Sequence, residues 1–321
     1  MAKIILTGST GFVGSDVLNK LVELNHSPVI ARRSLGQINN EFESIVVDSI
    51  DSNTNWKSSL RGCEVVIHCA ARVHMMNDES MDPLAAFREV NTFGTLNLAR
   101  SASQQGVKRF IFISSIKVNG ERSLLNKPFR PDDEMAPQDP YGISKAEAEE
   151  GLTNLAKETG MEVVIIRPPL VYGSGVKANF AALMKLTSFG IPLPFGCITD
   201  NSRSMVYVDN LVDLITKCIS HPKAANQTFL LSDDDDLSTA RMIKELSLAL
   251  GNKGWMLPIP VKFFEMLGKL TGKSETIDRL CGSLQVDISK TKQLLDWQPP
   301  VSVKDAFRET VSHFMLNQKH K

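Results

Sequence analysis

Residues 3–14 read KIILTGSTGFVG, and this stretch decides the fold class. Its apolar first half, Lys3–Thr7, predicts a short strand, and residues 11–24 have the apolar spacing of a helix. The glycines between them allow a tight turn and close approach of a diphosphate, and the start of the helix offers free N–H groups. This order of elements favours dinucleotide binding over a plain tight turn. The residues of the turn expected to contact such a cofactor are Gly8, Thr10, Gly11, Phe12, Val13 and Gly14.

Strands and helices continue to alternate as far as residue 167. Asp-Pro pairs at residues 82–83 and 139–140 provide a cap and a first-turn residue for two of the helices. Alternation of this kind implies βαβ units with right-handed crossovers, and hence an α/β fold with a Rossmann-type doubly wound parallel sheet. Further strands are expected at residues 28–31, 44–47, 64–68, 109–113 and 163–166, and further helices at 53–60, 82–103 and 139–159.

After Arg167 prolines become frequent, helices shorten and strands become scarce. This pattern indicates a smaller, mostly helical region over the carboxyl edge of the sheet. We expect a dinucleotide-binding domain over residues 1–167, to which residues 205–235 return in part. The second domain would comprise residues 168–204 and 236–321.

A tyrosine and a lysine four residues apart suggest a proton-transfer device. Tyr141 opens the run YGISK, and on a helix Lys145 lies one turn away on the same face. A free phenol ionises near pH ~10, and a neighbouring ammonium favours the phenolate. We therefore expect Lys145 to lower the pKa of Tyr141 toward the working range. The alternative is an ordinary surface helix, because the pattern also occurs by chance.

The end of the second predicted strand distinguishes between cofactors. An acidic residue there would bind the adenosine ribose of NAD, but the chain has Arg32 and Arg33, which suit a 2′-phosphate. Surface arginines are the structural alternative. We expect NADP(H) or NAD(H), with the arginines favouring NADP(H). Further candidate contacts, each with an alternative role in a turn, a cap or close packing, are Asp48, Ser49, Ala70 and Ala71.

Composition argues against several other classes of function. The 36 basic and 36 acidic residues cancel, so charge favours neither nucleic acid nor an anionic membrane. No apolar stretch approaches the ~20 residues of a membrane span. Five widely spaced cysteines predict neither a disulfide framework nor structural zinc, which fits a reducing cytoplasm. No metal is expected at His68 and His74, which lack helical ligand spacing, and residues 233–236 lead into a helix capped by Ser238.

The combined motifs resemble the extended short-chain dehydrogenase/reductases, and more narrowly the nucleotide-sugar branch that is UDP-glucose 4-epimerase-like. The resemblance rests on the turn at residues 7–14, on Ser115, Tyr141 and Lys145, and on RPPLVYG at residues 167–173. It covers nearly the whole chain. It implies a Rossmann-type cofactor domain, a small C-terminal domain that binds a UDP-sugar, and a homodimer formed by the helices that begin near Asp82 and Asp139.

The resemblance also assigns roles to individual residues. Tyr141 would be the acid and base, Lys145 would tune it and bind the ribose, and Ser115 would hydrogen-bond the sugar oxygen. Asn91 would lie behind the nicotinamide, and Arg203 would clamp the phosphates of the nucleotide. The remaining positions carried over are Pro168 for the cofactor, and Lys117, Asn179 and Phe180 for the substrate.

Several reactions share hydride transfer at C4 of the sugar. Dehydratases of this family have Asp-Glu after the serine or threonine, whereas this chain has Ile116 and Lys117, which argues against that reaction. The arginine pair, together with Asn119 at a position where epimerases commonly have tyrosine, favours a reductase. The run SIKVNG at residues 115–120 resembles proteins of surface polysaccharide synthesis, and this resemblance implies a reductase of UDP-4-keto-6-deoxy-N-acetylhexosamines. The alternatives are a UDP-glucose or UDP-N-acetylglucosamine 4-epimerase, and a non-catalytic NADP-binding sensor.

Overall fold

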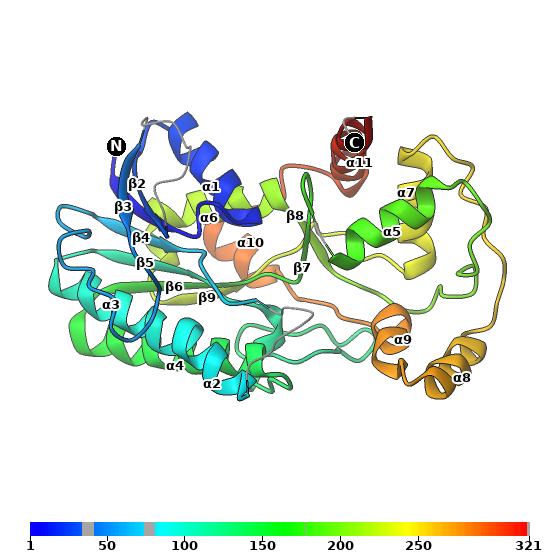
Figure 1. The fold of residues 1–321 in the computed structure, drawn as a ribbon, viewed down its shortest axis with the longest axis horizontal. Helices are drawn as coiled ribbons and strands as arrows, with labels where there is room; N and C mark the ends of the chain where they lie inside the picture. Colours follow the sequence, from blue (N-terminus) through cyan, green and yellow to red (C-terminus); the bar gives the residue numbers. More distant parts are fainter. Residues whose placement is uncertain (34–41, 74–80, 177, 320–321) are drawn as a thin grey trace.

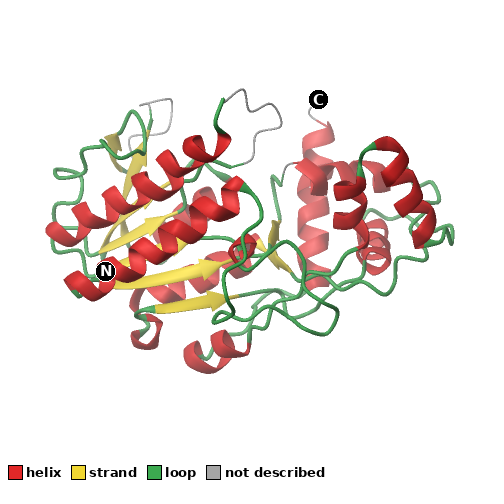
Figure 2. Cartoon of the chain, turned by 90° about the horizontal axis from the view of Figure 1, so that it is seen from below, coloured by secondary structure: helices red, strands yellow, loops and turns green. Residues whose placement is uncertain are grey.

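The computed structural model describes residues 1–33, 42–73, 81–176 and 178–319. A sheet covered by helices on both faces forms one part, and a mostly helical C-terminal region lies beside it (Figures 1 and 2). Within the described residues, no helix is long and apolar enough to cross a membrane.

The large sheet has seven strands among the described residues, and all of its paired neighbours run parallel. Their spatial order is β3-β2-β1-β4-β5-β6-β9, so the order reverses between β1 and β4, where doubly wound sheets bind ligands beyond the carboxyl ends of the strands. The expected fold is confirmed. The strands are β1 (Lys3–Thr7), β2 (Ser27–Arg32), β3 (Glu43–Val46), β4 (Val65–His68), β5 (Arg109–Ile113), β6 (Glu162–Arg167) and β9 (Gln227–Leu230).

Alternate residues of the strands fill two separate cores. In β1, Ile4 and Leu6 join the core beneath α1 (Phe12–Glu23) and α6 (Val208–Ser220). Ile5, which points to the other face, joins the core beneath α3 (Thr95–Gln104) and α4 (Pro140–Thr159). Figure 1 shows these two pairs of helices on opposite faces of the sheet. Burial on both faces explains why the strands read as continuous apolar runs.

Both Asp-Pro pairs begin helices as predicted. The Asp82 carboxylate accepts a hydrogen bond from the Ala85 amide and caps α2 (Pro83–Phe87), which continues through the π-helical segment η1 (Arg88–Gly94) into α3. Asp139 caps α4 by accepting from the Gly142 amide over 2.7 Å. Ser238 likewise caps α7 (Thr239–Ala249), as expected.

The predicted helix at residues 53–60 is wrong, because these residues form turns. Polar side chains there bond to nearby amides and compete with helix formation. The Asp51 carboxylate accepts from the Asn53 amide over 2.8 Å, and the Asn55 side chain accepts from the Lys57 amide over 3.1 Å.

Three strands were not predicted. β9 adds a seventh strand beside β6, while β7 (Leu170–Tyr172) and β8 (Met205–Tyr207) form a small parallel sheet. The remaining elements are η2 (Ile116–Val118), α5 (Ala178–Ser188), η3 (Pro222–Ala224), α8 (Val261–Thr271), α9 (Ser274–Cys281), α10 (Ser289–Leu295) and α11 (Val303–Lys319).

Candidate active site

The glycine turn lies at the carboxyl end of β1 and leaves no room for a side chain at Gly8 or Gly14. Gly8 has φ +75°, and a Cβ there would lie 2.6 Å from the Ala70 amide nitrogen at the end of β4. A Cβ on Gly14 would lie 2.0 Å from the Gly8 carbonyl oxygen. The Gly11 amide donates to that same carbonyl over 2.9 Å. The turn therefore needs glycine at Gly8 for its conformation and at Gly14 for packing.

Several polar groups around this turn have no hydrogen-bond partner in the described part of the chain, and this arrangement suits a bound dinucleotide. The buried Ser9 hydroxyl and the buried Arg32 Nε have no hydrogen-bond partner among the described residues. No side chain caps α1, so its first amides are available to a phosphate. Buried polar groups are almost always paired, so these two groups could hydrogen-bond to a dinucleotide. Arg33 is exposed beside Arg32.

The other predicted cofactor contacts lie in the turn at residues 8–14 and in the segments that follow β3 and β4. Asp48 and Ser49 are exposed after β3, and the Ser49 hydroxyl donates to Asp51. Ala70 and Ala71 are half-buried after β4. Thr10 is exposed in the turn, while Phe12 and Val13 are half-buried in the first turn of α1 and pack against the core. His74 lies outside the described residues.

A buried histidine at the carboxyl end of β4 connects β1 to α3. The His68 ring lies 2.6 Å (Nδ1) from the Thr7 hydroxyl of β1 and 2.9 Å (Nε2) from the Thr95 hydroxyl of α3. Burial lowers the pKa of His68 to about 3, with a further contribution from Lys145, so the ring is neutral at physiological pH. The sequence suggested no role for His68 beyond that of a possible metal ligand, because a single buried histidine at the end of a strand carries no pattern that predicts its two hydroxyl partners. No cluster of possible metal ligands occurs among the described residues.

Asn91 connects the loop after β4 to α4. Its side chain accepts from the Arg72 amide over 2.8 Å and donates to the Arg72 carbonyl and the Ser144 hydroxyl, each over 3.0 Å. It is 1% exposed, and it lies in the π-helical segment η1. These hydrogen bonds show that Asn91 has a structural role. Its expected position behind the nicotinamide stays a prediction.

Ser115, Tyr141 and Lys145 lie together at the carboxyl end of β5. The Tyr141 hydroxyl hydrogen-bonds the Ser115 side chain, and its ring meets Phe87 edge-on at 6.1 Å. The Lys145 ammonium donates to the Ile113 carbonyl over 2.9 Å and lies 6.0 Å from the centre of the Tyr141 ring. A hydroxyl that can exchange a proton is thus held beside a second hydroxyl and a buried cation.

The pKa of Tyr141 differs from the expected direction. The Tyr141 pKa is raised to about 12, chiefly by burial and also by the Asp139 carboxylate, while the hydrogen bond from Ser115 acts in the opposite direction. Burial also lowers the pKa of Lys145 to about 8. The prediction that Lys145 brings the phenol into the working range is wrong for the chain alone. A phenol that acts at neutral pH needs a further positive charge nearby.

The loop after β5 is fixed at both ends. The Ile116 amide donates to the Pro168 carbonyl over 3.0 Å, and the Ser115 hydroxyl accepts from the Lys117 amide over 3.2 Å. The Lys117 ammonium pairs with Asp139 and with Glu121, the latter at 3.1 Å. Lys117, predicted to bind substrate, therefore already has two carboxylate partners, Asp139 at the start of α4 and Glu121 in the loop after η2.

Asn119 belongs to a buried polar network. Its carboxamide accepts from Arg167 over 2.9 Å and donates to the Arg130 carbonyl over 3.0 Å. Arg167 also pairs with Glu149 at 2.5 Å, and both side chains are at most 3% exposed. Asn119 thus has a structural role, and its identity does not favour a reductase over an epimerase.

The predicted nucleotide contacts lie in the second region. Arg203 donates to the Arg279 carbonyl over 2.8 Å, and its pKa is lowered by burial and by the charges of Arg279 and Arg122. No carboxylate in the described part of the chain pairs with Arg203, so its charge is available to a phosphate. The Phe180 side chain is buried and stacks on Tyr172 at 5.3 Å, so it packs in the core. The expected role of Asn179 and Phe180, at the start of a helix, as a cradle for the diphosphate stays a prediction. The Asn179 side chain lies outside the described part.

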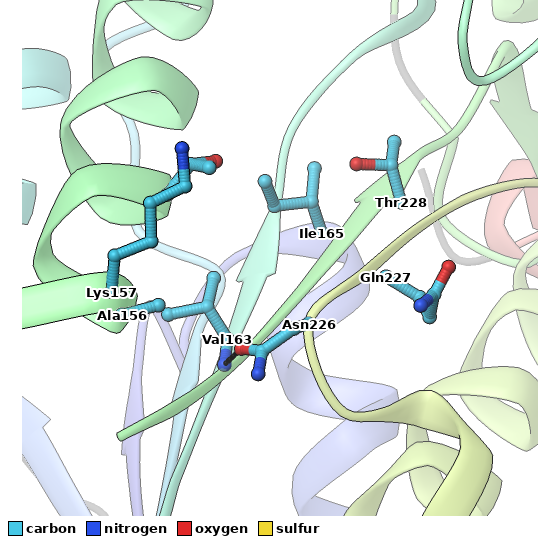
Figure 3. A pocket seen from close by; sticks show the side chains of 8 residues that line it. Ala156, Lys157, Val163, Ile165, Asn226, Gln227 and Thr228 are labelled. Carbon is cyan, nitrogen blue, oxygen red and sulfur yellow. Dashed lines mark hydrogen bonds between the residues drawn. The ribbon is translucent and has the colours of Figure 1, made fainter. Parts of the chain in front are cut away.

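A pocket of about 300 Å³ lies away from these residues, between the end of α4 and strands β6 and β9 (Figure 3). Its wall includes Lys157, about 24 Å along α4 from Tyr141 at 1.5 Å per residue. At its base the Asn226 side chain accepts from the Val163 amide over 3.0 Å. It lies at the amino ends of the strands, so it is not the reaction site.

Comparison with known proteins agrees with this geometry. A sequence profile described as the NAD dependent epimerase/dehydratase family matches residues 4–231. The chain belongs to this family. A "UDP-glucose 4-epimerase" of Vibrio cholerae is 53% identical over 314 residues, covering 97% of this chain and 95% of that protein.

Two further similar proteins are informative. An Escherichia coli O157:H7 protein named "N-acetyl-alpha-D-glucosaminyl-diphospho-ditrans,octacis-undecaprenol 4-epimerase" is 29% identical, covering 89% of this chain and 88% of that protein. The solved structure of "UDP-N-acetylglucosamine 4-epimerase from Bacillus cereus" superposes with a TM-score of 0.79 at 20% identity, covering 99% of this chain and 100% of the other. At that identity the match shows the fold alone.

Proposed function

We propose that this protein is a 4-epimerase of a UDP-linked hexose, in preference to the 4-keto-sugar reductase that the sequence favoured. The 53% identity to a UDP-glucose 4-epimerase along almost the whole chain carries the proposal. The open Ser9 hydroxyl and the glycine turn support a bound dinucleotide, and the family description indicates NAD. The reductase reading depended in part on Asn119, which lies in a buried structural network.

The residues of the chain divide the work in this proposal. NAD, held by the glycine turn, Arg32 and Lys145, would supply hydride uptake and return at C4. Tyr141 would take the proton from the C4 hydroxyl and give it back, while Ser115 hydrogen-bonds the same oxygen. Because the Tyr141 pKa is about 12 in the chain alone, the positive charge of an oxidised nicotinamide would favour the phenolate.

A second candidate function is the same 4-epimerisation on a sugar that is linked through a diphosphate to a polyprenol instead of to uridine. The Escherichia coli relative is named for a sugar diphosphate linked to a polyprenol, and UDP-sugars share the sugar-diphosphate part. Arg203 can serve the diphosphate in either case. The two carriers differ only beyond the phosphates.

Purified protein is incubated with UDP-galactose, UDP-N-acetylglucosamine or a polyprenyl-diphosphate N-acetylglucosamine, without added cofactor. We expect interconversion of a C4 pair in one of these, detected by chromatography of the released sugars. Turnover that occurs only with stoichiometric NADPH and a 4-keto sugar would return the assignment to the reductase.

A further inference from the structure

Helix α8 turns an apolar stripe away from the protein. Phe263, Met266, Leu267 and Leu270 follow the i, i+3, i+4, i+7 spacing that places side chains on one helix face. These four residues are between 43% and 76% exposed. In globular proteins a stripe of this spacing normally faces the core, so its exposure here requires an explanation.

The opposite face of α8 is firmly anchored. Phe264 is buried and stacks on Phe195 with ring centres 5.9 Å apart. Gly268 lies against Ile277 of α9, where a Cβ would come within 2.8 Å of the isoleucine side chain. Figure 1 shows α8 at the outer corner of the helical region, away from the sheet. The apolar stripe is therefore exposed on a helix whose other face is packed against the protein.

The segment before α8 extends the apolar area. Trp255 is 65% exposed and Leu257 is 49% exposed. Hydrogen bonds to Leu193 at both residues, 3.1 and 2.7 Å long, fix this segment beside the chain that leaves α5. We define the α8 surface as Trp255, Leu257, Phe263, Met266, Leu267 and Leu270.

Local charge identifies the kind of partner. Residues 253–273 contain four lysines and one glutamate, although the whole chain has equal numbers of acidic and basic residues. All four lysines are exposed, and none pairs with a carboxylate in the described part of the chain. One of them, Lys253, lies 5.3 Å from the Trp255 ring. The lysines are Lys253, Lys262, Lys269 and Lys273.

Tryptophan and aliphatic side chains flanked by lysines are typical of helices that lie in the membrane interface. A second copy of the chain would bring the same positive charges into contact, which is unfavourable, whereas anionic headgroups complement them. We propose that the α8 surface docks on a lipid membrane that contains anionic headgroups, with α8 lying in the plane of the interface. Docking requires neither NAD nor a sugar, so it stands apart from the proposed reaction.

Vesicle sedimentation tests the docking. We expect the full chain to sediment with phosphatidylglycerol–phosphatidylethanolamine vesicles and to remain in the supernatant with phosphatidylcholine vesicles. The emission of Trp255 should shift to shorter wavelength on binding, because Trp56 and Trp297 are already buried. Equal distribution with and without anionic vesicles would overturn the proposal.

Two variants and a control locate the contact. Phe263→Ser with Leu270→Ser, and separately Lys262→Gln with Lys269→Gln, should each lower the partition coefficient at least about tenfold. The control Leu124→Ser with Leu125→Ser changes exposed leucines outside the α8 surface and should leave binding unchanged. All three should keep the native thermal transition and the same UDP-sugar turnover. Unchanged vesicle binding in the serine variant, or its conversion from dimer to monomer in sedimentation velocity, would contradict membrane docking.

Discussion

The Lys145 ammonium lies 6.0 Å from the centre of the Tyr141 ring, one turn along α4, and gives its hydrogen bond to the Ile113 carbonyl. At this distance the lysine does not offset the burial that raises the pKa of Tyr141 to about 12. The pair is therefore incomplete as a proton-transfer device. We infer that the device is completed by the charge of the cofactor, which links proton transfer to cofactor occupancy.

Removing the phenol hydroxyl should abolish most of the turnover. Tyr141→Phe keeps the ring against Phe87 but has no proton to exchange, so kcat should fall roughly 10²- to 10⁴-fold. The matched control is Tyr207→Phe, whose hydroxyl bonds Glu309 outside the site and should leave kcat unchanged. UDP binding, measured by calorimetry, should be the same in both. A Tyr141→Phe enzyme with normal kcat would remove the tyrosine from the mechanism.

Two effects of replacing a glycine, a clash of the new Cβ with neighbouring atoms and strain at a positive φ, can be separated by comparing Gly8 with Gly62. Gly8 and Gly62 both have φ +75°, but only at Gly8 would a Cβ meet neighbouring atoms. Gly62→Ala should lower the free energy of unfolding by about 1 kcal/mol and keep the cofactor. Gly8→Ala should be less stable than Gly62→Ala and should purify without nucleotide, as judged by chromatography of the released cofactor. Similar cofactor content in the two variants would contradict the account of the turn.

The arginines after β2 should discriminate between cofactors. The Arg32 Nε is buried and has no hydrogen-bond partner in the described part of the chain. Two guanidinium groups suit a 2′-phosphate. Replacing Arg32 and Arg33 with alanine should weaken NADPH more than NADH in fluorescence titrations of nucleotide-free protein. The exposed Arg61 provides the control, since its replacement should affect neither. Equal losses for NADPH and NADH would mean that the arginines do not read the phosphate.

The buried histidine should make stability depend on pH. The folded pKa of His68 is about 3, below the ~6.5 of an unfolded chain, so the unfolded state binds more protons between these values. Its contribution is fully present above pH ~6.5 and is lost as the pH falls toward 3. Between pH 7 and pH 5 the loss should be about 2 kcal/mol.

Urea unfolding at the two pH values measures this loss. His68→Gln keeps a polar group between Thr7 and Thr95 but does not titrate, so its stability should change less between pH 7 and pH 5. An equal change in the wild-type protein and the variant would exclude His68 as the cause.

Much of the first half could be predicted because its signals are local. The glycine turn after β1 and the caps Asp82 and Asp139 fix elements within a few residues of themselves. β9 could not be found in this way, because its four residues become a strand only by pairing with β6, which ends 60 residues earlier. The turns at residues 53–60 also escaped, since side-chain bonds such as that of Asp51 overrode a helical pattern.

The sequence predicted which residues form the site more reliably than it predicted their contacts and pKa values. Tyr141, Lys145 and Ser115 come together because one helix and one strand end position them. The buried positions of the Phe180 and Asn119 side chains were not foreseen, because a motif does not show whether a side chain turns into the core or toward a ligand. The sign of the Tyr141 pKa shift also depended on desolvation, which only the packed structure reveals.

The most direct test of the central claim is the conversion of a UDP-hexose by purified protein with no cofactor added, followed by proton NMR in parallel with Tyr141→Phe. The account predicts that the wild-type protein brings the two C4 epimers to a constant ratio from either side, and that the variant leaves each of them unchanged over the same time. An inactive wild-type protein that still carries its nucleotide, or a variant that converts the sugar equally fast, would contradict it.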